Sequence, residues 1–115
     1  MEYDSFPICK KSLYLAVYFE TIVGNFSRYH KYTVGTELMN KSKETLGLLV
    51  KAINGKDRLE HLLLVRDKLE ELKLLVRICK EIKAFRNFNS FEHSVKQVEE
   101  ISRQNEGWMK KQKQR

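Results

Sequence analysis

The chain has 115 residues with a net charge of +7, and 42% of its residues are hydrophobic and 32% charged. This length suits one compact domain, and the apolar fraction excludes a disordered chain. One proline and five glycines cannot supply the turns that an all-β sandwich needs every ~8–12 residues, so the chain is expected to be all-α.

The first predicted helix spans about residues 10–23 and follows Pro7, a residue that suits a helix start. Its middle, LYLAVYF, is apolar nearly all round, which indicates a helix covered on more than one side. A polar and aromatic break over residues 24–33 separates it from a second helix predicted over about 34–53. We expect Gly55 to end that second helix in the left-handed conformation.

The third helix, predicted over about residues 58–86, has the strongest pattern, and Asp57 is expected to cap it. Its heptad seam consists of Leu62, Val65, Leu69, Leu72, Val76 and Cys79. The fourth helix is predicted over about 90–109, with Asn89 and Glu92 spaced as a capping box. These elements predict an antiparallel up-and-down four-helix bundle over residues 1–109, followed by a disordered basic tail over 110–115.

A second apolar row lies beside the heptad seam in the C-terminal half of the third helix. It consists of Leu75, Ile78, Ile82 and Phe85. The core of one bundle accounts for only one of the two rows. We therefore expect the second row to form the interface of a homo-oligomer.

Catalytic and metal-binding patterns are missing from the sequence. His30, His61 and His93 do not stand in the Glu-x-x-His spacing of bundle metal sites. The glycines match no phosphate-binding loop, and no nucleophile elbow is present. The sequence therefore predicts a protein that is not an enzyme and has no metal site and no cofactor.

Several features favour a cytoplasmic protein. Glu2 and Asp4 stand where a secretory leader would need a basic start. The longest apolar run, residues 13–19, is far shorter than the ~20 residues that cross a bilayer, so no membrane partner is expected. Both cysteines are expected to be reduced, Cys79 inert in the core and Cys9 reactive near the terminus.

Positive charge favours a polyanionic partner, nucleic acid before an anionic membrane. On the third helix, one side carries Arg66, Lys73, Arg77 and Lys80. One alternative is that this stripe is a solvent-exposed face with ion pairs along the helix. The other is that it is a surface that binds phosphates or an acidic protein. The C-terminal segment adds Lys110 and Lys111 as candidate contacts.

Aromatic residues leave two further alternatives open. Arg28, His30 and Lys31 alternate with Tyr29 and Tyr32. These tyrosines either stack on nucleic-acid bases or seal the end of the core. Trp108 is either a buried anchor at the end of the bundle or a contact for a subunit or partner.

Three segments, in order along residues 12–111, resemble the accessory variability determinant (Avd) proteins of diversity-generating retroelements. The first is HKYTVGTEL, which resembles the family's basic-aromatic-Thr-x-Gly opening of the second helix. The second is DKLEELKLLVRICKEIK, which is similar to the family's acidic-x-Leu-Glu-x-Leu-Arg core. The third is EEISRQNEGWMKK, which resembles the family's closing Gly-Trp motif. The chain departs from the family pattern at Lys73, Cys79, Ser102 and Glu106.

The resemblance implies a homopentamer of four-helix protomers that binds a reverse transcriptase and its template RNA. Such a protein supports error-prone complementary DNA synthesis without doing chemistry itself. The matches place Lys31, Lys73 and Arg77 at basic positions of the family, and Trp108 at its closing aromatic.

The alternative is a structural or protein-interaction bundle with incidental positive charge. The proteins encoded in intervening sequences of bacterial large-subunit ribosomal RNA genes share the bundle. Their Arg-Arg-Ala-Ala signature in the second helix is missing from TELMNKSKETLGLLVKAING. The sequence therefore favours a retroelement accessory protein over a protein of the ribosomal RNA intervening-sequence type.

Overall fold

The computed structural model describes residues 5–114. Its helices are α1 (Pro7–Val23), α2 (Arg28–His30), the π-helix η2 (Lys31–Gly35), α3 (Thr36–Asn54), α4 (Arg58–Glu81) and α5 (Phe88–Lys113). No strand occurs in this part of the chain. The all-α class is confirmed.

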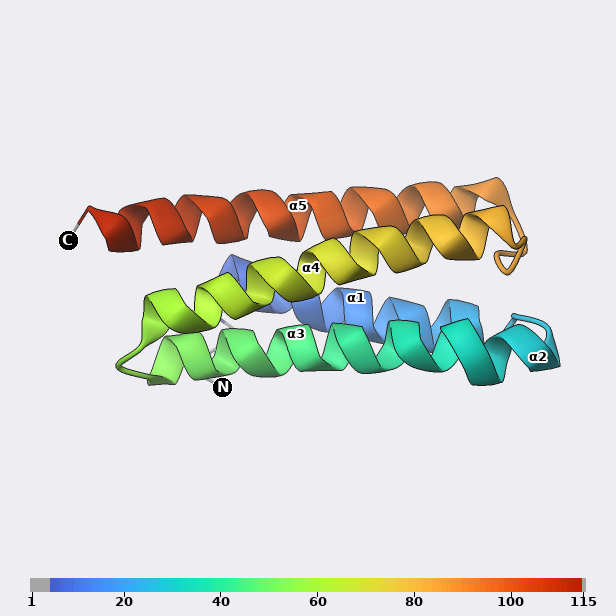
Figure 1. Cartoon of the computed structure of the whole chain (residues 1–115), viewed down its shortest axis with the longest axis horizontal. Helices are drawn as coiled ribbons and strands as arrows, with labels where there is room; N and C mark the ends of the chain where they lie inside the picture. The colour runs from blue at the N-terminus through green and yellow to red at the C-terminus, as the bar shows by residue number, and fades with distance from the viewer. Residues whose placement is uncertain (1–4, 115) are drawn as a thin grey trace.

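Four long helices, α1, α3, α4 and α5, run alternately up and down in an antiparallel bundle of 47 × 25 × 20 Å (Figure 1). Both α1 and α4 pack against α3 and α5, so the four helices close into a square. The α1–α2 and α4–α5 connections lie at one end of this bundle, and the α3–α4 loop lies at the other. We call the first of these the two-loop end; it comprises residues 24–35 and 82–87.

The heptad seam of α4 lies in the core, as predicted. Its six members are all buried, and they meet buried side chains from each of the other long helices. These partners include Phe19 of α1, Leu49 of α3 and Ile101 of α5. Each such side chain contributes about 1.5–3 kcal/mol by leaving water, so this seam is a main source of the stability of the bundle.

The second predicted helix starts earlier than expected because α2, η2 and α3 follow one another without a break. Thr36 Oγ1 donates a hydrogen bond of 3.2 Å to the carbonyl of Lys31 within this wide turn. Gly35 lies against α1, where a Cβ atom would be 2.6 Å from Val23 Cγ1. The glycine of the Thr-x-Gly motif thus permits a close approach of two helices.

The turn at Asn54 and Gly55 ends α3 as predicted, but Gly55 is extended (φ −101°, ψ 166°) rather than left-handed. A Cβ atom there would lie 2.8 Å from the carbonyl oxygen of Lys51. Glycine is therefore needed for a close contact and not for a positive φ. Asp57 stands at the N-cap of α4, but its side chain makes no capping hydrogen bond.

Helix α4 ends at Glu81, earlier than predicted, in a Schellman motif. The amide of Ala84 donates to the carbonyl of Cys79 at 2.8 Å, and the amide of Lys83 donates to that of Lys80 at 3.0 Å. Lys83 takes the left-handed position (φ 61°) that glycine usually fills. The apolar spacing continues past this point, and for that reason the predicted helix was too long.

Helix α5 begins and ends differently from the prediction. Asn87 is its N-cap and accepts a hydrogen bond of 2.8 Å from the amide of Ser90, a role predicted for Asn89. The helix then continues to Lys113, so the segment predicted as a disordered tail is helical over most of its length. Lysine and glutamine are good helix formers, and basic residues are favourable at a helix C-terminus.

Candidate functional site

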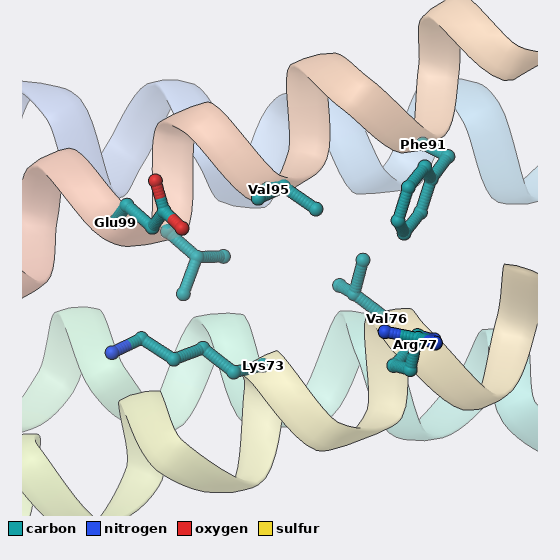
Figure 2. Close-up of a pocket in the computed structure, with 7 residues that line it drawn as sticks. Lys73, Val76, Arg77, Phe91, Val95 and Glu99 are labelled. Carbon is teal, nitrogen blue, oxygen red and sulfur yellow. The ribbon is translucent and has the colours of Figure 1, made fainter.

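Two cations of the predicted stripe, Lys73 and Arg77, lie on the rim of a groove between α4 and α5 (Figure 2). The groove has a volume of about 240 Å³. Its apolar lining consists of Val76, Phe91, Val95 and Val98, and Glu99 also lines it. An apolar lining beside cations suits an amphipathic protein segment better than a bare phosphate chain.

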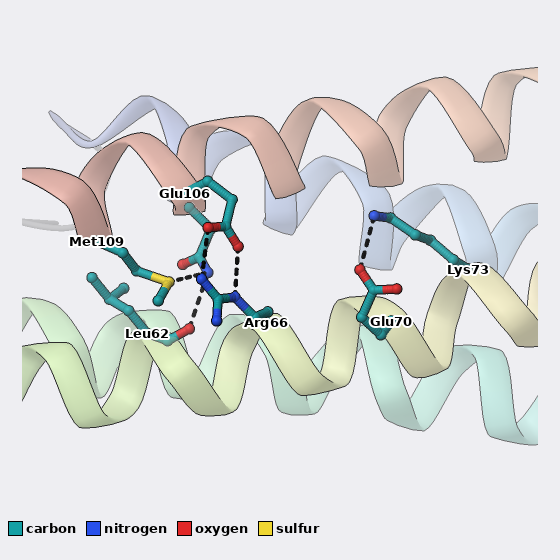
Figure 3. Close-up of polar contacts among 7 residues, drawn as sticks. Leu62, Arg66, Glu70, Lys73, Glu106 and Met109 are labelled. Carbon is teal, nitrogen blue, oxygen red and sulfur yellow. Dashed lines mark hydrogen bonds and ion pairs between the residues drawn. The ribbon is translucent and has the colours of Figure 1, made fainter.

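The cations of the stripe carry carboxylate partners. Arg66 and Glu106 form a bidentate pair between α4 and α5, with N–O distances of 2.7 and 2.8 Å (Figure 3). Lys73 Nζ lies 3.1 Å from Glu70 Oε1 in the same view. The Arg66 guanidinium lowers the pKa of Glu106, mainly through this hydrogen bond.

The other two cations of the stripe share one carboxylate. Arg77 Nε and Lys80 Nζ lie 3.3 and 4.0 Å from Glu81 Oε2. Lys80 also stands 5.0 Å from the ring centre of Phe91, a cation–π contact. The structure thus shows the ion-paired form of the stripe, and binding by its residues stays a prediction.

The remaining predicted contacts lie away from the stripe. Lys31 begins η2 at the two-loop end and is half-buried. Lys110 and Lys111 are exposed on the last turns of α5, at the opposite end of the bundle. The predicted cations therefore occupy three separate places and do not form one site.

The tyrosines of residues 28–32 do not seal the core. Tyr29 and Tyr32 are 74% and 70% exposed. Phe26 and Phe85 close this end instead, with ring centres 5.7 Å apart. The sealing alternative is therefore wrong for both tyrosines.

The second apolar row of α4 is divided between core and surface. Leu75 is buried, and Phe85 packs against the core, so neither forms a free oligomer face as predicted. Ile78 and Ile82 are each 41% exposed, and Leu74, which the sequence analysis did not single out, is 65% exposed. The exposed apolar surface at the end of α4 therefore consists of Leu74, Ile78 and the C-cap residue Ile82.

Trp108 lies at the end of the bundle opposite the two-loop end, where α1 begins and α5 ends. Its ring stacks on Phe6 at 5.6 Å between centres, and the guanidinium of Arg58 lies 5.1 Å from its ring centre. Arg58 in turn donates hydrogen bonds to the carbonyls of Ala52 and Ile53, in the last turn of α3, where carbonyls lack intrahelical donors. Trp108 therefore packs at the end of the bundle as the anchor alternative predicts, but it is half-buried rather than buried, and a subunit or partner contact stays a prediction.

Asn105 is a fully buried polar residue that the sequence analysis missed. Its Nδ2 donates to the backbone carbonyl of Leu62 at 3.0 Å, across from α5 to α4. Its Oδ1 has no hydrogen-bond partner among the described residues. The spacing could have found this position, because Asn105 follows Val98 and Ile101 and precedes Met109 at helical intervals on the buried side of α5. Its polar side chain, within the run SRQNE, hid that signal.

Both cysteines are buried, including Cys9, which the sequence placed at an accessible terminus. Burial raises the pKa of the Cys79 thiol to about 12. Within residues 5–114, no cluster of three or more His, Cys, Asp or Glu side chains could hold a metal ion. Nor is any described helix both long and apolar enough to traverse a bilayer.

The fold and surface define a four-helix bundle protein with an ion-paired flank and an excess of cations. A family model described as bAvd-like matches residues 7–112. The chain therefore belongs to the bAvd-like family, which confirms the resemblance to Avd proteins. No curated protein and no solved structure gives a significant match.

Proposed function

We propose that this protein is a non-catalytic accessory subunit of a diversity-generating retroelement. It binds the reverse transcriptase and the template RNA or its complementary DNA, and it supports mutagenic complementary DNA synthesis in the cytoplasm. The family match over residues 7–112 carries this proposal. The excess of 22 Lys and Arg over 15 Asp and Glu supports a polyanionic ligand.

The groove between α4 and α5 is the proposed contact for the reverse transcriptase. Lys73 and Arg77 stand at family basic positions and line this groove together with apolar side chains. Among residues 5–114, both cations form ion pairs with carboxylates of their own helix, Glu70 and Glu81, which an acidic partner can replace without separating two helices. Exposed ion pairs of this kind contribute about 0–1 kcal/mol each, so exchanging partners costs little.

Assembly into a homo-oligomer, five subunits by the family resemblance, would cover the exposed apolar surface of α4. Light scattering of the purified chain tests this directly against the 13.7 kDa protomer mass. Replacing Ile78 and Ile82 with Glu is expected to dissociate the assembly and leave helicity intact. A monomeric wild type would refute the oligomer.

Charge reversal tests the role of the groove. The variant Lys73→Glu/Arg77→Glu is expected to lose co-purification with the reverse transcriptase and to abolish complementary DNA synthesis. The control Lys11→Glu/Lys43→Glu changes the net charge equally, and its two lysines pair with carboxylates on other helices. Normal complementary DNA yield from the Lys73 and Arg77 variant would contradict the proposed contact.

A purely structural bundle is the second candidate function, and the ion-paired stripe favours it. A reverse transcriptase gene beside a pair of near-identical repeats that differ at adenines supports the first candidate. Absence of both from the neighbouring genes would support the second. Truncation after Met109 removes the four cations Lys110, Lys111, Lys113 and Arg115, and it is expected to weaken nucleic-acid affinity without abolishing polymerase association.

A further inference from the structure

The two-loop end gathers cations that have no carboxylate partner. Arg28 and Lys31 come from the helical turns after α1, and Lys83 and Arg86 come from the α4–α5 loop. None of these four forms an ion pair with a carboxylate of residues 5–114, whereas every cation of the α4 stripe has one. Unpaired cations remain available to an incoming anion at no cost in broken ion pairs.

The two loops are held together, so these cations belong to one surface. Arg86 Nε donates a hydrogen bond to the backbone carbonyl of Asn25 in the α1–α2 loop. The Phe26–Phe85 ring contact joins the same two loops on the inner side. Residues separated by about 60 positions in the chain thus form a single face at the end of the bundle (Figure 1).

A shallow hollow of about 340 Å³ lies in this face. Its lining consists of Lys80, Lys83, Arg86, Asn87, Phe85, Phe88 and Phe91. No carboxylate of residues 5–114 lines it, although Glu20, Glu37, Glu81 and Glu92 belong to helix turns at the same end. Glu81 is paired with Arg77, and Glu20 with Lys43. A hollow lined by cations and aromatic rings suits a flat, anionic ligand.

Exposed aromatic rings are the second component of the face. Tyr29 and Tyr32 both lie on the α2–η2 turn, and both side chains are exposed. Phe88, beside the hollow, is 60% exposed. Large rings exposed in this way cost free energy in water unless a ligand covers them.

We propose that the two-loop end binds single-stranded nucleic acid, with bases stacked on Tyr29, Tyr32 and Phe88 and phosphates held by the unpaired cations. Free base faces exist only in an unpaired strand, because a duplex already stacks them. An acidic peptide would satisfy the cations and leave the rings without a matching surface. The inference rests on the proposed function, which supplies nucleic acid as the ligand. It assigns that binding to a face that shares only Lys80 with the α4 stripe.

The test compares substitutions of the two tyrosines by anisotropy of a labelled 20-nucleotide oligothymidine at fixed salt. Tyr29→Ala/Tyr32→Ala is expected to weaken binding at least fivefold, because alanine substitution of a stacking ring costs about 1–3 kcal/mol per base. Tyr29→Phe/Tyr32→Phe keeps the ring faces and is expected to bind like the wild type. Tyr14→Ala, at a tyrosine of α1 that is 48% exposed, is the matched control.

Two further measurements separate stacking from other contacts. Tyr29→Leu/Tyr32→Leu keeps apolar area but no ring, and it is expected to lose affinity as the alanine variant does. Replacing Lys83 and Arg86 with Gln is expected to make the salt dependence shallower by about 0.7 per phosphate contact removed. Circular dichroism is expected to be unchanged in the tyrosine variants, since both side chains are exposed.

The outcomes distinguish this inference from the proposed function. Wild-type affinity in the alanine or leucine variant would overturn the stacking site and leave nucleic-acid binding by other residues in place. A chain that binds no oligonucleotide at all would overturn the site together with the nucleic-acid part of the proposed function. Equal loss of affinity for a duplex of the same length would show that the tyrosines do not select unpaired strands, which also overturns the proposal.

Discussion

Gly35 and Gly47 lie in one helical stretch, and the same substitution at the two positions is expected to change stability in opposite directions. Gly47 is exposed in α3, and a Cβ atom there would meet nothing within 4 Å. At Gly35 a Cβ atom would lie 2.6 Å from Val23 Cγ1 and 3.0 Å from the carbonyl oxygen of His30. Only the second site lacks room for a methyl group.

The magnitudes follow from helix propensity and packing. Gly47→Ala is expected to stabilise the bundle by about 0.5–1 kcal/mol, the gain of alanine over glycine in a helix. Gly35→Ala gains no more than that, and overpacking against Val23 costs about 1–3 kcal/mol. For a domain of this length about 1 kcal/mol corresponds to roughly 4 °C, so Tm is expected to rise by ~2–4 °C in the first variant and to fall in the second.

Thermal and urea unfolding followed by circular dichroism at 222 nm measures both effects. A Val23→Ala background supplies the missing room, so Gly35→Ala is expected to be less destabilising there than in the wild type. Stabilisation by Gly35→Ala equal to that of Gly47→Ala would refute the close approach of α1 and η2. An unchanged penalty in the Val23→Ala background would show that the His30 carbonyl, and not Val23, is the obstacle.

Three further predictions concern buried and paired groups. Asn105→Leu is expected to stabilise the protein by about 1 kcal/mol in urea unfolding, because it removes a buried oxygen without a partner among the described residues. The lowered pKa of Glu106 means that its pair with Arg66 stabilises the fold above the carboxyl's ordinary pKa and loses that effect as pH falls through the lowered value. The stability difference between wild type and Arg66→Gln is therefore expected to shrink on acidification below about pH 4. Cys9 and Cys79 are expected to react with a thiol reagent only after unfolding, and rapid labelling of either in the native protein would contradict their burial.

The sequence predicts well what depends on periodicity. The heptad spacing of α4 places Cys79 in the core, and the structure buries it. Helix ends depend instead on local backbone hydrogen bonds, and a lysine at the left-handed position of a Schellman motif leaves no signal in the composition. Cys9 was expected to be accessible, but α1 begins at Pro7 and directs the thiol into the core.

Relations between helices are the part that the sequence does not predict. Arg66 meets Glu106 only because of the register of α4 against α5, and 40 positions separate them in the chain. The same holds for Arg86, whose loop comes beside Asn25 only in the folded bundle. The number of charges could therefore be counted from the sequence. Which cations form ion pairs and which are available to a ligand could not be predicted from it.

Because η2 is a wide π-helical turn, the direction in which the outward side chains of Arg28–His30 point depends on the number of residues over positions 31–35. A π-turn holds one residue more than an α-turn, and each residue of a helix rotates the chain by about 100°. Deleting one residue there would turn the preceding segment by about a quarter of a revolution, while α3 from Thr36 onward would keep its place against α1. A single insertion or deletion could thus redirect the outward side chains of this turn while the four long helices keep their packing.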